Sequence, residues 1–129
     1  MHISILDAGI GSVSGLFGRV VIILLVVILI EALVMFLFKL NKVGKVFLHS
    51  AFVNIVSTII GFIMLDQIDY VGTRFSGLSQ WFIFYAATVL IEGLLLMLLY
   101  SKTPKQKIWL VAAVMNLSSY LFLYFISLF

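Results

Sequence analysis

Residues 19–39 have the sequence RVVIILLVVILIEALVMFLFK, an apolar run with a basic residue at each end and one acid, Glu31, inside it. Runs of about 18 or more apolar residues are typical of helices that cross a lipid bilayer. Many of these residues are β-branched, but an open strand in lipid would leave its backbone groups without hydrogen-bond partners. The stretch therefore predicts a transmembrane helix over 20–38.

The rest of the chain is apolar as well. Of its 129 residues, 64% are hydrophobic and 10% are charged. A soluble domain of this length could not bury so much apolar surface, because small domains have a high ratio of surface to volume. The four predicted spans cover residues 20–38, 46–65, 81–100 and 108–129. The sequence thus predicts an all-α integral membrane protein, with one transmembrane domain over 1–129 and membrane lipids around it.

The two halves of the chain resemble each other. LIEALVMF at 29–36 corresponds to LIEGLLLM at 90–97, and AFVNIVST at 51–58 corresponds to AVMNLSSY at 113–120. Self-similarity of this kind indicates a duplicated helical hairpin, with repeats predicted over 19–65 and 81–129. Each hairpin crosses the bilayer twice, so both begin on the same side. We therefore expect a pseudo-two-fold axis along the membrane normal to relate them.

Two segments lie outside the predicted hairpins. Residues 1–18 are apolar but rich in glycine, and we expect them to lie at the membrane interface, with a loose tail as the alternative. Residues 66–80 form the long connection between the hairpins and are expected on the extracytoplasmic side. Within the spans, small residues such as Gly61 and Ala112 are expected where helices approach closely.

The basic residues predict the orientation in the membrane. Six of the eight flank the two hairpin turns: Lys39, Lys42, Lys45, Lys102, Lys105 and Lys107. Positive charge beside short loops indicates the cytoplasmic side. We predict a bacterial inner membrane protein whose lysine-rich turns (39–45 and 102–107) are cytoplasmic and whose two termini lie outside the cytoplasm.

Polar residues recur at one depth of the predicted bundle. Each glutamate and each asparagine lies 8 to 10 residues from the nearest turn lysine, which is about 12–15 Å at ~1.5 Å of rise per residue. In each hairpin the amide can donate to the carboxyl group, and a neutral carboxyl group can donate to the amide oxygen. A serine follows each asparagine by about one helical turn. The predicted buried layer consists of Glu31, Asn54, Ser57, Glu92, Asn116 and Ser119.

Two roles remain open for this layer. A charged side chain at the centre of a bilayer costs roughly 2.5–3.5 kcal/mol or more. Both glutamates should therefore face the bundle interior, a partner or a water-filled space. Polar side chains also join membrane helices, so the layer could be purely structural. It could instead bind a proton or a cation, because asparagine alone would join helices at lower cost than glutamate.

Several functional classes are disfavoured. The sequence has no phosphate-binding loop, no zinc-protease motif and no nucleophile beside a base, so we expect no enzyme activity, no catalytic residue and no cofactor. It has no cysteine, and His2 is the only other histidine that could join His49 in a haem or metal site. The lysines are too few and too confined to the turns for nucleic-acid binding.

Two functions therefore remain. The sequence slightly favours an accessory or scaffold subunit of a larger membrane complex, whose polar layer joins its helices or contacts a partner subunit. The alternative is a small homo-oligomeric transporter or channel that binds a proton or a cation at Glu31 and Glu92.

Overall fold

The computed structural model describes the backbone of residues 4–68 and 77–128 and the side chains of 14–64 and 77–128. The described residues form four α-helices: α1 (Ser4–Leu37), α2 (Val43–Ile68), α3 (Gly77–Leu99) and α4 (Lys105–Ser127). Each contains a segment of 22 to 24 residues that is long and apolar enough to cross a membrane. This confirms the predicted all-helical class with four membrane-length helices, and it is consistent with an integral membrane protein.

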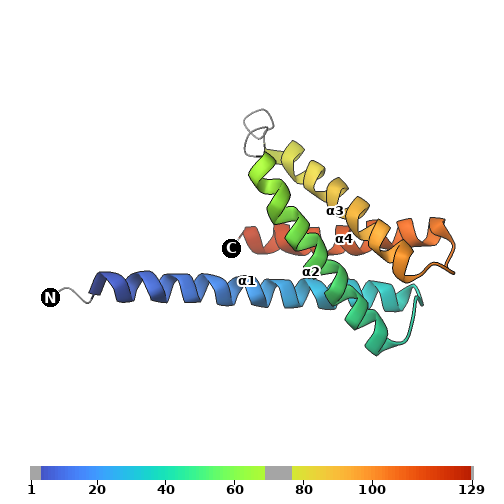
Figure 1. Cartoon of the computed structure of the whole chain (residues 1–129), viewed down its shortest axis with the longest axis horizontal. Coiled ribbons are helices and arrows are strands. Elements are labelled where there is room, and N and C mark those ends of the chain that lie inside the picture. Colours follow the sequence, from blue (N-terminus) through green and yellow to red (C-terminus); the bar gives the residue numbers. More distant parts are fainter. Residues whose placement is uncertain (1–3, 69–76, 129) are drawn as a thin grey trace.

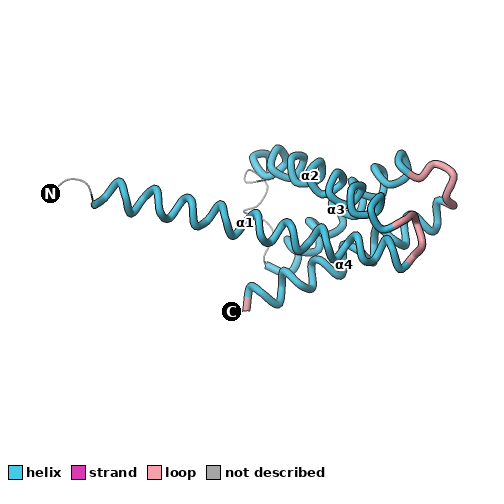
Figure 2. Tube along the Cα trace, turned by 90° about the horizontal axis from the view of Figure 1, so that it is seen from below, coloured by secondary structure: helices cyan, strands magenta, loops and turns pink. Residues whose placement is uncertain are grey.

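The helices pack as a ring of four. α1 packs against α2 and α4, and α3 packs against the same two helices, so α1 and α3 lie diagonally opposite each other. Both hairpin turns lie at one end of the bundle, which we name the lysine end, while the start of α1 and the end of α4 lie at the other (Figures 1 and 2). From the lysine end, α2 and α3 diverge from α1 and α4 (Figure 1).

Short turns hold each hairpin together. After α1, the Lys39 N–H donates to the carbonyl of Phe36 at 2.8 Å, and the Leu40 N–H donates to the carbonyl of Met35 at 3.1 Å. Lys39 has a φ of 54°, the left-handed conformation in which many helices end. Before α4 the chain has Pro104, which suits a helix start because it has no N–H to satisfy.

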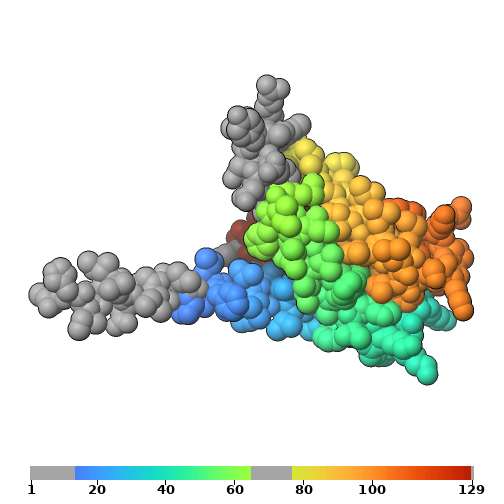
Figure 3. All heavy atoms as spheres, viewed as in Figure 1, coloured from blue at the N-terminus to red at the C-terminus, as the bar shows by residue number. Residues whose placement is uncertain are grey.

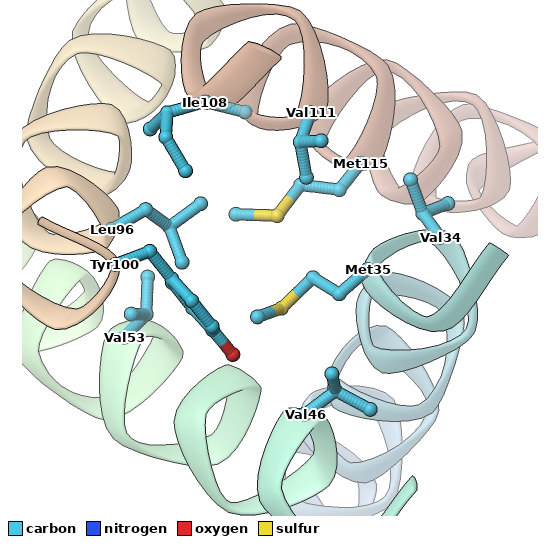
Figure 4. Close-up of a cluster of buried hydrophobic side chains, with 10 residues drawn as sticks. Val34, Met35, Val46, Val53, Leu96, Tyr100, Ile108, Val111 and Met115 are labelled. Atoms are coloured by element: carbon cyan, nitrogen blue, oxygen red, sulfur yellow. The ribbon is translucent and has the colours of Figure 1, made fainter. Parts of the chain in front are cut away.

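Apolar side chains fill the bundle between the lysine end and its middle (Figure 4). The ten core residues are Val34, Met35, Val46, Val53, Leu96, Tyr100, Ile108, Val111, Ala112 and Met115. Close packing of α3 on α4 is visible at Gly93, where a Cβ atom would overlap the ring of Trp109. Lipid tails are as apolar as these side chains, so the core stabilises the bundle mainly by van der Waals contact.

The outer surface is also apolar. In an apolar stretch of 18 residues within each membrane-length segment, 17–28% of the residues are buried in the bundle. Large exposed side chains occur on every helix, among them Leu25, Phe52, Leu98 and Phe125. Figure 3 shows the face that α1, α2 and α3 form, with α4 largely behind them. Such a surface needs lipid tails or partner helices around it.

Each of the four helices begins before its predicted span, and α2 also ends after it. The backbone of residues 4–18 continues into the first span as a single helix, α1; glycine weakens a helix without breaking its backbone hydrogen bonds. Its predicted position at the membrane interface stays a prediction. α2 continues to Ile68 and α3 begins at Gly77, because polar residues can extend a helix past its apolar part. The connection predicted over 66–80 therefore narrows to 69–76, which lies outside the described residues.

Candidate functional site

Glu31 of α1 lies in the middle of the bundle with 1% of its surface exposed. The Asn54 amide nitrogen of α2 donates to Glu31 Oε2 at 2.5 Å. The Ser119 hydroxyl of α4 donates to Glu31 Oε1 at 2.9 Å. Each carboxyl oxygen thus has one donor, and the two donors come from the two helices that pack against α1.

Glu92 of α3 has the same arrangement and is also 1% exposed. The Asn116 amide nitrogen of α4 donates to Glu92 Oε2 at 2.8 Å. The Ser57 hydroxyl of α2 donates to Glu92 Oε1 at 2.7 Å. In both hairpins the asparagine bond lies within the hairpin, while the serine bond links one hairpin to the other.

These four bonds connect every pair of neighbouring helices once. The pairs are α1–α2, α2–α3, α3–α4 and α4–α1, so the bonds close a ring around the bundle. All six predicted residues lie together and are buried. We name the set Glu31, Asn54, Ser57, Glu92, Asn116 and Ser119 the polar layer.

Both asparagines are also anchored on their own helices. The second N–H of Asn54 donates to the Ser50 carbonyl at 3.0 Å, and that of Asn116 donates to the Ala112 carbonyl at 3.0 Å. Ser50 donates in turn to the Ile28 carbonyl of α1 at 2.9 Å. The predicted return bond, from a protonated carboxyl group to the amide oxygen of each asparagine, stays a prediction.

A cavity of about 360 Å³ lies beside the polar layer, on the side away from the lysine end. All six residues of the polar layer line its base. The residues of the base and the walls come from all four helices. Two lining residues, Val20 and Phe62, are 51% and 64% exposed. The cavity therefore reaches the outer surface of the bundle.

Gly61 also lines this cavity, and a Cβ atom there would meet nothing within 4 Å. The prediction that it permits a close helix contact is therefore wrong. Gly61 lies in the second half of α2, and α2 diverges from α1 away from the lysine end (Figure 1). A glycine leaves space between diverging helices. Ala112, in contrast, is fully buried in the core, as predicted.

The electrostatics of the site are unbalanced. Among the residues whose side chains the structure describes, no lysine, arginine or histidine lines the cavity or bonds to either glutamate. The donors are two neutral amides and two neutral hydroxyls. Two ionised carboxyl groups in a low-dielectric setting lose hydration and repel each other. Among the described residues, no basic side chain is placed to compensate such a charge.

Aromatic side chains surround the cavity on the α3 and α4 side. The hydroxyl oxygens of Thr88 and Tyr120 are 3.0 Å apart, and Tyr85 donates to the Ala113 carbonyl at 3.0 Å. The Tyr120 ring packs edge-on against Trp81 and Tyr85, with centroids 5.9 and 5.7 Å apart. This cluster fixes the Tyr120 ring on the cavity wall.

A separate polar contact lies near the lysine end. His49 Nδ1 and the Tyr100 hydroxyl are 2.6 Å apart, and their rings pack edge-on. Burial raises the pKa of Tyr100 to about 12, because a phenolate loses hydration inside the protein. His49 thus has a hydrogen-bond partner in Tyr100. Groups of three or more His, Cys, Asp or Glu side chains that could hold a metal ion are absent from the described residues.

In comparisons with protein families, curated proteins and solved structures, nothing matches this chain.

Proposed function

We propose that the chain spans the membrane as two duplicated hairpins related by a pseudo-two-fold axis along the membrane normal. The matching hydrogen bonds support this relationship. Glu31 bonds to the asparagine of its own hairpin and the serine of the other, and so does Glu92. In this proposal the lysine end faces the cytoplasm, in keeping with the positive charge of its two turns.

We also propose that this protein is a non-enzymatic membrane protein that binds a proton or a cation between Glu31 and Glu92, as one step of transport. One observation carries the proposal: two buried acids from different hairpins line the same cavity. The hydrogen bonds orient both carboxyl groups but contribute no positive charge. Charge compensation must then come from a proton or from a cation that enters the cavity.

The accessory-subunit role, which the sequence alone favours, ranks second here. Each carboxyl oxygen already has a donor from within the chain, so the polar layer needs no partner subunit to be satisfied. The end of α4 supports this second candidate, because Tyr124 and Phe125 are 50% and 60% exposed. Aromatic side chains are common where proteins meet. Isolation in mild detergent tests it: a stable complex with other membrane proteins supports a subunit, and a homo-oligomer contradicts it.

The binding proposal is tested with the purified full-length protein in lipid vesicles. Infrared difference spectroscopy between low and high pH should show a carboxylic acid band in the wild type. The part of the band that comes from the two glutamates should shrink in Glu31→Gln and in Glu92→Gln and be absent from the double variant, which keeps only the band of the aspartates and the C-terminal carboxyl group. Proton or cation flux into the vesicles should be lost in the double variant as well. Ser118→Ala is the control, since the hydroxyl of Ser118 donates to the Val114 carbonyl of its own helix and, within the described residues, to no other helix.

Wild-type vesicles without any glutamate-dependent band or flux would overturn the binding proposal.

A further inference from the structure

We infer that the cavity beside the polar layer binds an organic ammonium ion with an apolar body, rather than a bare metal cation. This inference rests on the proposed proton or cation binding and assigns a chemical class to the ligand. It is carried by the contrast between the two parts of the cavity. Its base is polar and its walls are apolar, and these two parts match the two parts of such a ligand.

The base offers hydrogen-bond acceptors without free donors. Both N–H groups of Asn54 and both of Asn116 are used, one on a glutamate and one on the helix backbone. The two serine hydroxyls donate to the glutamates as well. What remains for a ligand is the carboxyl oxygens and the two amide oxygens. An ammonium group is a donor only, so it complements this base in both charge and hydrogen bonding.

The walls are largely apolar on all four helices, with hydroxyl groups at Thr58, Thr88 and Tyr120. Their apolar residues include Val27 of α1, Phe62 of α2, Phe84 of α3 and Leu123 of α4. A hydrated metal ion would lose part of its water against such walls and gain no favourable contact with them in return. The apolar body of an organic cation would instead gain contact with the walls. Tyr120 and Phe84 add aromatic faces, which attract ammonium groups.

The size of the cavity fits this class of ligand. Its volume of about 360 Å³ lies at the lower end of the roughly 300–1,000 Å³ typical of small-molecule sites. One aromatic ring with a short aminoalkyl chain is a ligand of that order. The ligand can enter past the exposed side chains of Val20 and Phe62.

Binding should release a proton. When the cavity is empty, a proton compensates the charge of the glutamate pair. When an ammonium ion binds, that carboxyl group loses its O–H proton to water, and the carboxylate accepts a hydrogen bond from the ammonium. The ionisable side chains that line the cavity are Glu31 of α1, Glu92 of α3 and Tyr120 of α4, with none from α2 among the described residues. The two glutamates supply the exchange.

The test is calorimetric titration of the purified full-length protein in mild detergent, in buffers of different ionisation enthalpy. The probes are 2-phenylethylammonium chloride, neutral 2-phenylethanol, and sodium chloride. We expect the ammonium to bind with release of a proton and the alcohol to bind at least about tenfold more weakly, the order of effect of one charged hydrogen bond. Glu31→Gln with Glu92→Gln should weaken the ammonium by at least about tenfold for the same reason.

Two glycine variants test the location of the site without touching the glutamates. Gly61→Leu fills open space within the cavity, and it should abolish ammonium binding while leaving the pH-dependent carboxylic acid band intact. Gly18→Leu is the matched control, because Gly18 also has open space around it but does not line the cavity. It should bind like the wild type. If the double glutamine variant fails to fold, as judged by circular dichroism, the comparison of Gly61→Leu with Gly18→Leu still tests whether the ammonium binds in the cavity.

Three results would overturn the inference: no ammonium binding, equal binding of the alcohol, or unchanged binding in Gly61→Leu. If the carboxylic acid band or sodium binding still depends on the glutamates in any of these cases, the proposed function survives and only the ligand class is wrong. If neither the band nor sodium binding depends on the glutamates, both the proposed function and the ligand class are wrong.

Discussion

The Ser119 hydroxyl donates to the Glu31 carboxyl group across 88 residues of chain, and it joins the last helix of the bundle to the first. Ser57 makes the corresponding contact with Glu92, between the two middle helices. The asparagine bonds reinforce hairpins that short turns already hold together. The serine bonds, in contrast, link the two hairpins. Removal of a serine should therefore weaken the contact between hairpins rather than a hairpin itself.

Ser57→Ala and Ser119→Ala should each lower the free energy of unfolding by about 0.6–2 kcal/mol, the range measured for polar contacts between membrane helices. Each change leaves one buried carboxyl oxygen without its donor. The measurement is a titration with denaturing detergent followed by circular dichroism. Ser118→Ala should change stability by less than about 0.5 kcal/mol, because that hydroxyl bonds only within α4. Equal effects at all three serines would contradict a special role for the bonds between hairpins.

The structural role of the carboxyl groups is tested by changing shape as well as charge. Glu31→Leu leaves one buried amide N–H of Asn54 without its acceptor, at a cost of about 1–3 kcal/mol, while the Ser119 hydroxyl can still donate to the Met115 or Asn116 carbonyl of its own helix. Glu31→Gln keeps an acceptor oxygen and should destabilise the bundle less. The same order is expected at Glu92, whose donors match. A leucine variant as stable as the wild type would mean that the polar layer does not hold the bundle together.

Part of this site follows from the sequence. Glu31 and Asn54 lie at similar distances from the lysines of one hairpin turn. The two helices of a tight hairpin are neighbours, so the depth of the two residues predicts their contact. The same holds for Glu92 and Asn116. The six residues of the polar layer could therefore be named, and the structure brings all of them together.

The serine bonds and the cavity could not be predicted in the same way. The faces by which the two hairpins meet depend on the packing of helices that are far apart in the sequence. The partner of Ser57, one turn after Asn54, therefore cannot be predicted without the position of α3. The cavity arises because helix axes diverge away from the lysine end (Figure 1), and composition does not encode that divergence. Gly61 shows the consequence, since a small residue suits a close contact and an open space equally.

Close packing of α3 on α4 predicts a large effect at one glycine. Gly93→Ala places a Cβ atom against the Trp109 ring, and overpacking of this kind typically costs about 1–3 kcal/mol. Trp109→Leu should relieve the collision, so the double variant should be more stable than the sum of the two single changes predicts. Gly61→Ala is the control: it meets open space and should be neutral or stabilising, by up to about 1 kcal/mol from helix propensity. Additive single changes would show that the two residues are not in contact.

The buried phenol near the lysine end predicts a loss of stability in alkali. Tyr100 has a pKa of about 12 in the folded protein and 10.0 in the unfolded chain, so the folded state holds its proton more tightly. The contribution of Tyr100 to the free energy of unfolding is complete below pH 10 and is lost as the pH rises through about 12. The measurement compares the unfolding of the wild type and Tyr100→Phe between about pH 8 and about pH 12, a range centred on the pKa of a free tyrosine.

We expect the difference in stability between the two proteins to shrink as the pH rises, because only the wild type has a phenol to ionise. Lysine titration affects both proteins equally and cancels in the comparison. Below pH 10 the variant should be less stable by about 0.5–1.5 kcal/mol, the value of one hydrogen bond, here the bond to His49. A constant difference across the whole range would mean that Tyr100 does not ionise later in the folded state.

The proposed orientation gives a prediction that needs no purified protein. The chain has no cysteine, so a single introduced thiol reports one position. Gly44→Cys and Ser101→Cys place exposed thiols at the lysine end, and Ser127→Cys places one at the other end of the bundle.

A membrane-impermeant maleimide added to intact bacterial cells should label the thiol at residue 127 alone. The two thiols at the lysine end should react only after the membrane is opened, because positively charged turns stay in the cytoplasm. Labelling of residues 44 and 101 in intact cells would reverse the orientation, and labelling of just one of them would contradict the parallel duplication, which requires both turns on the same side.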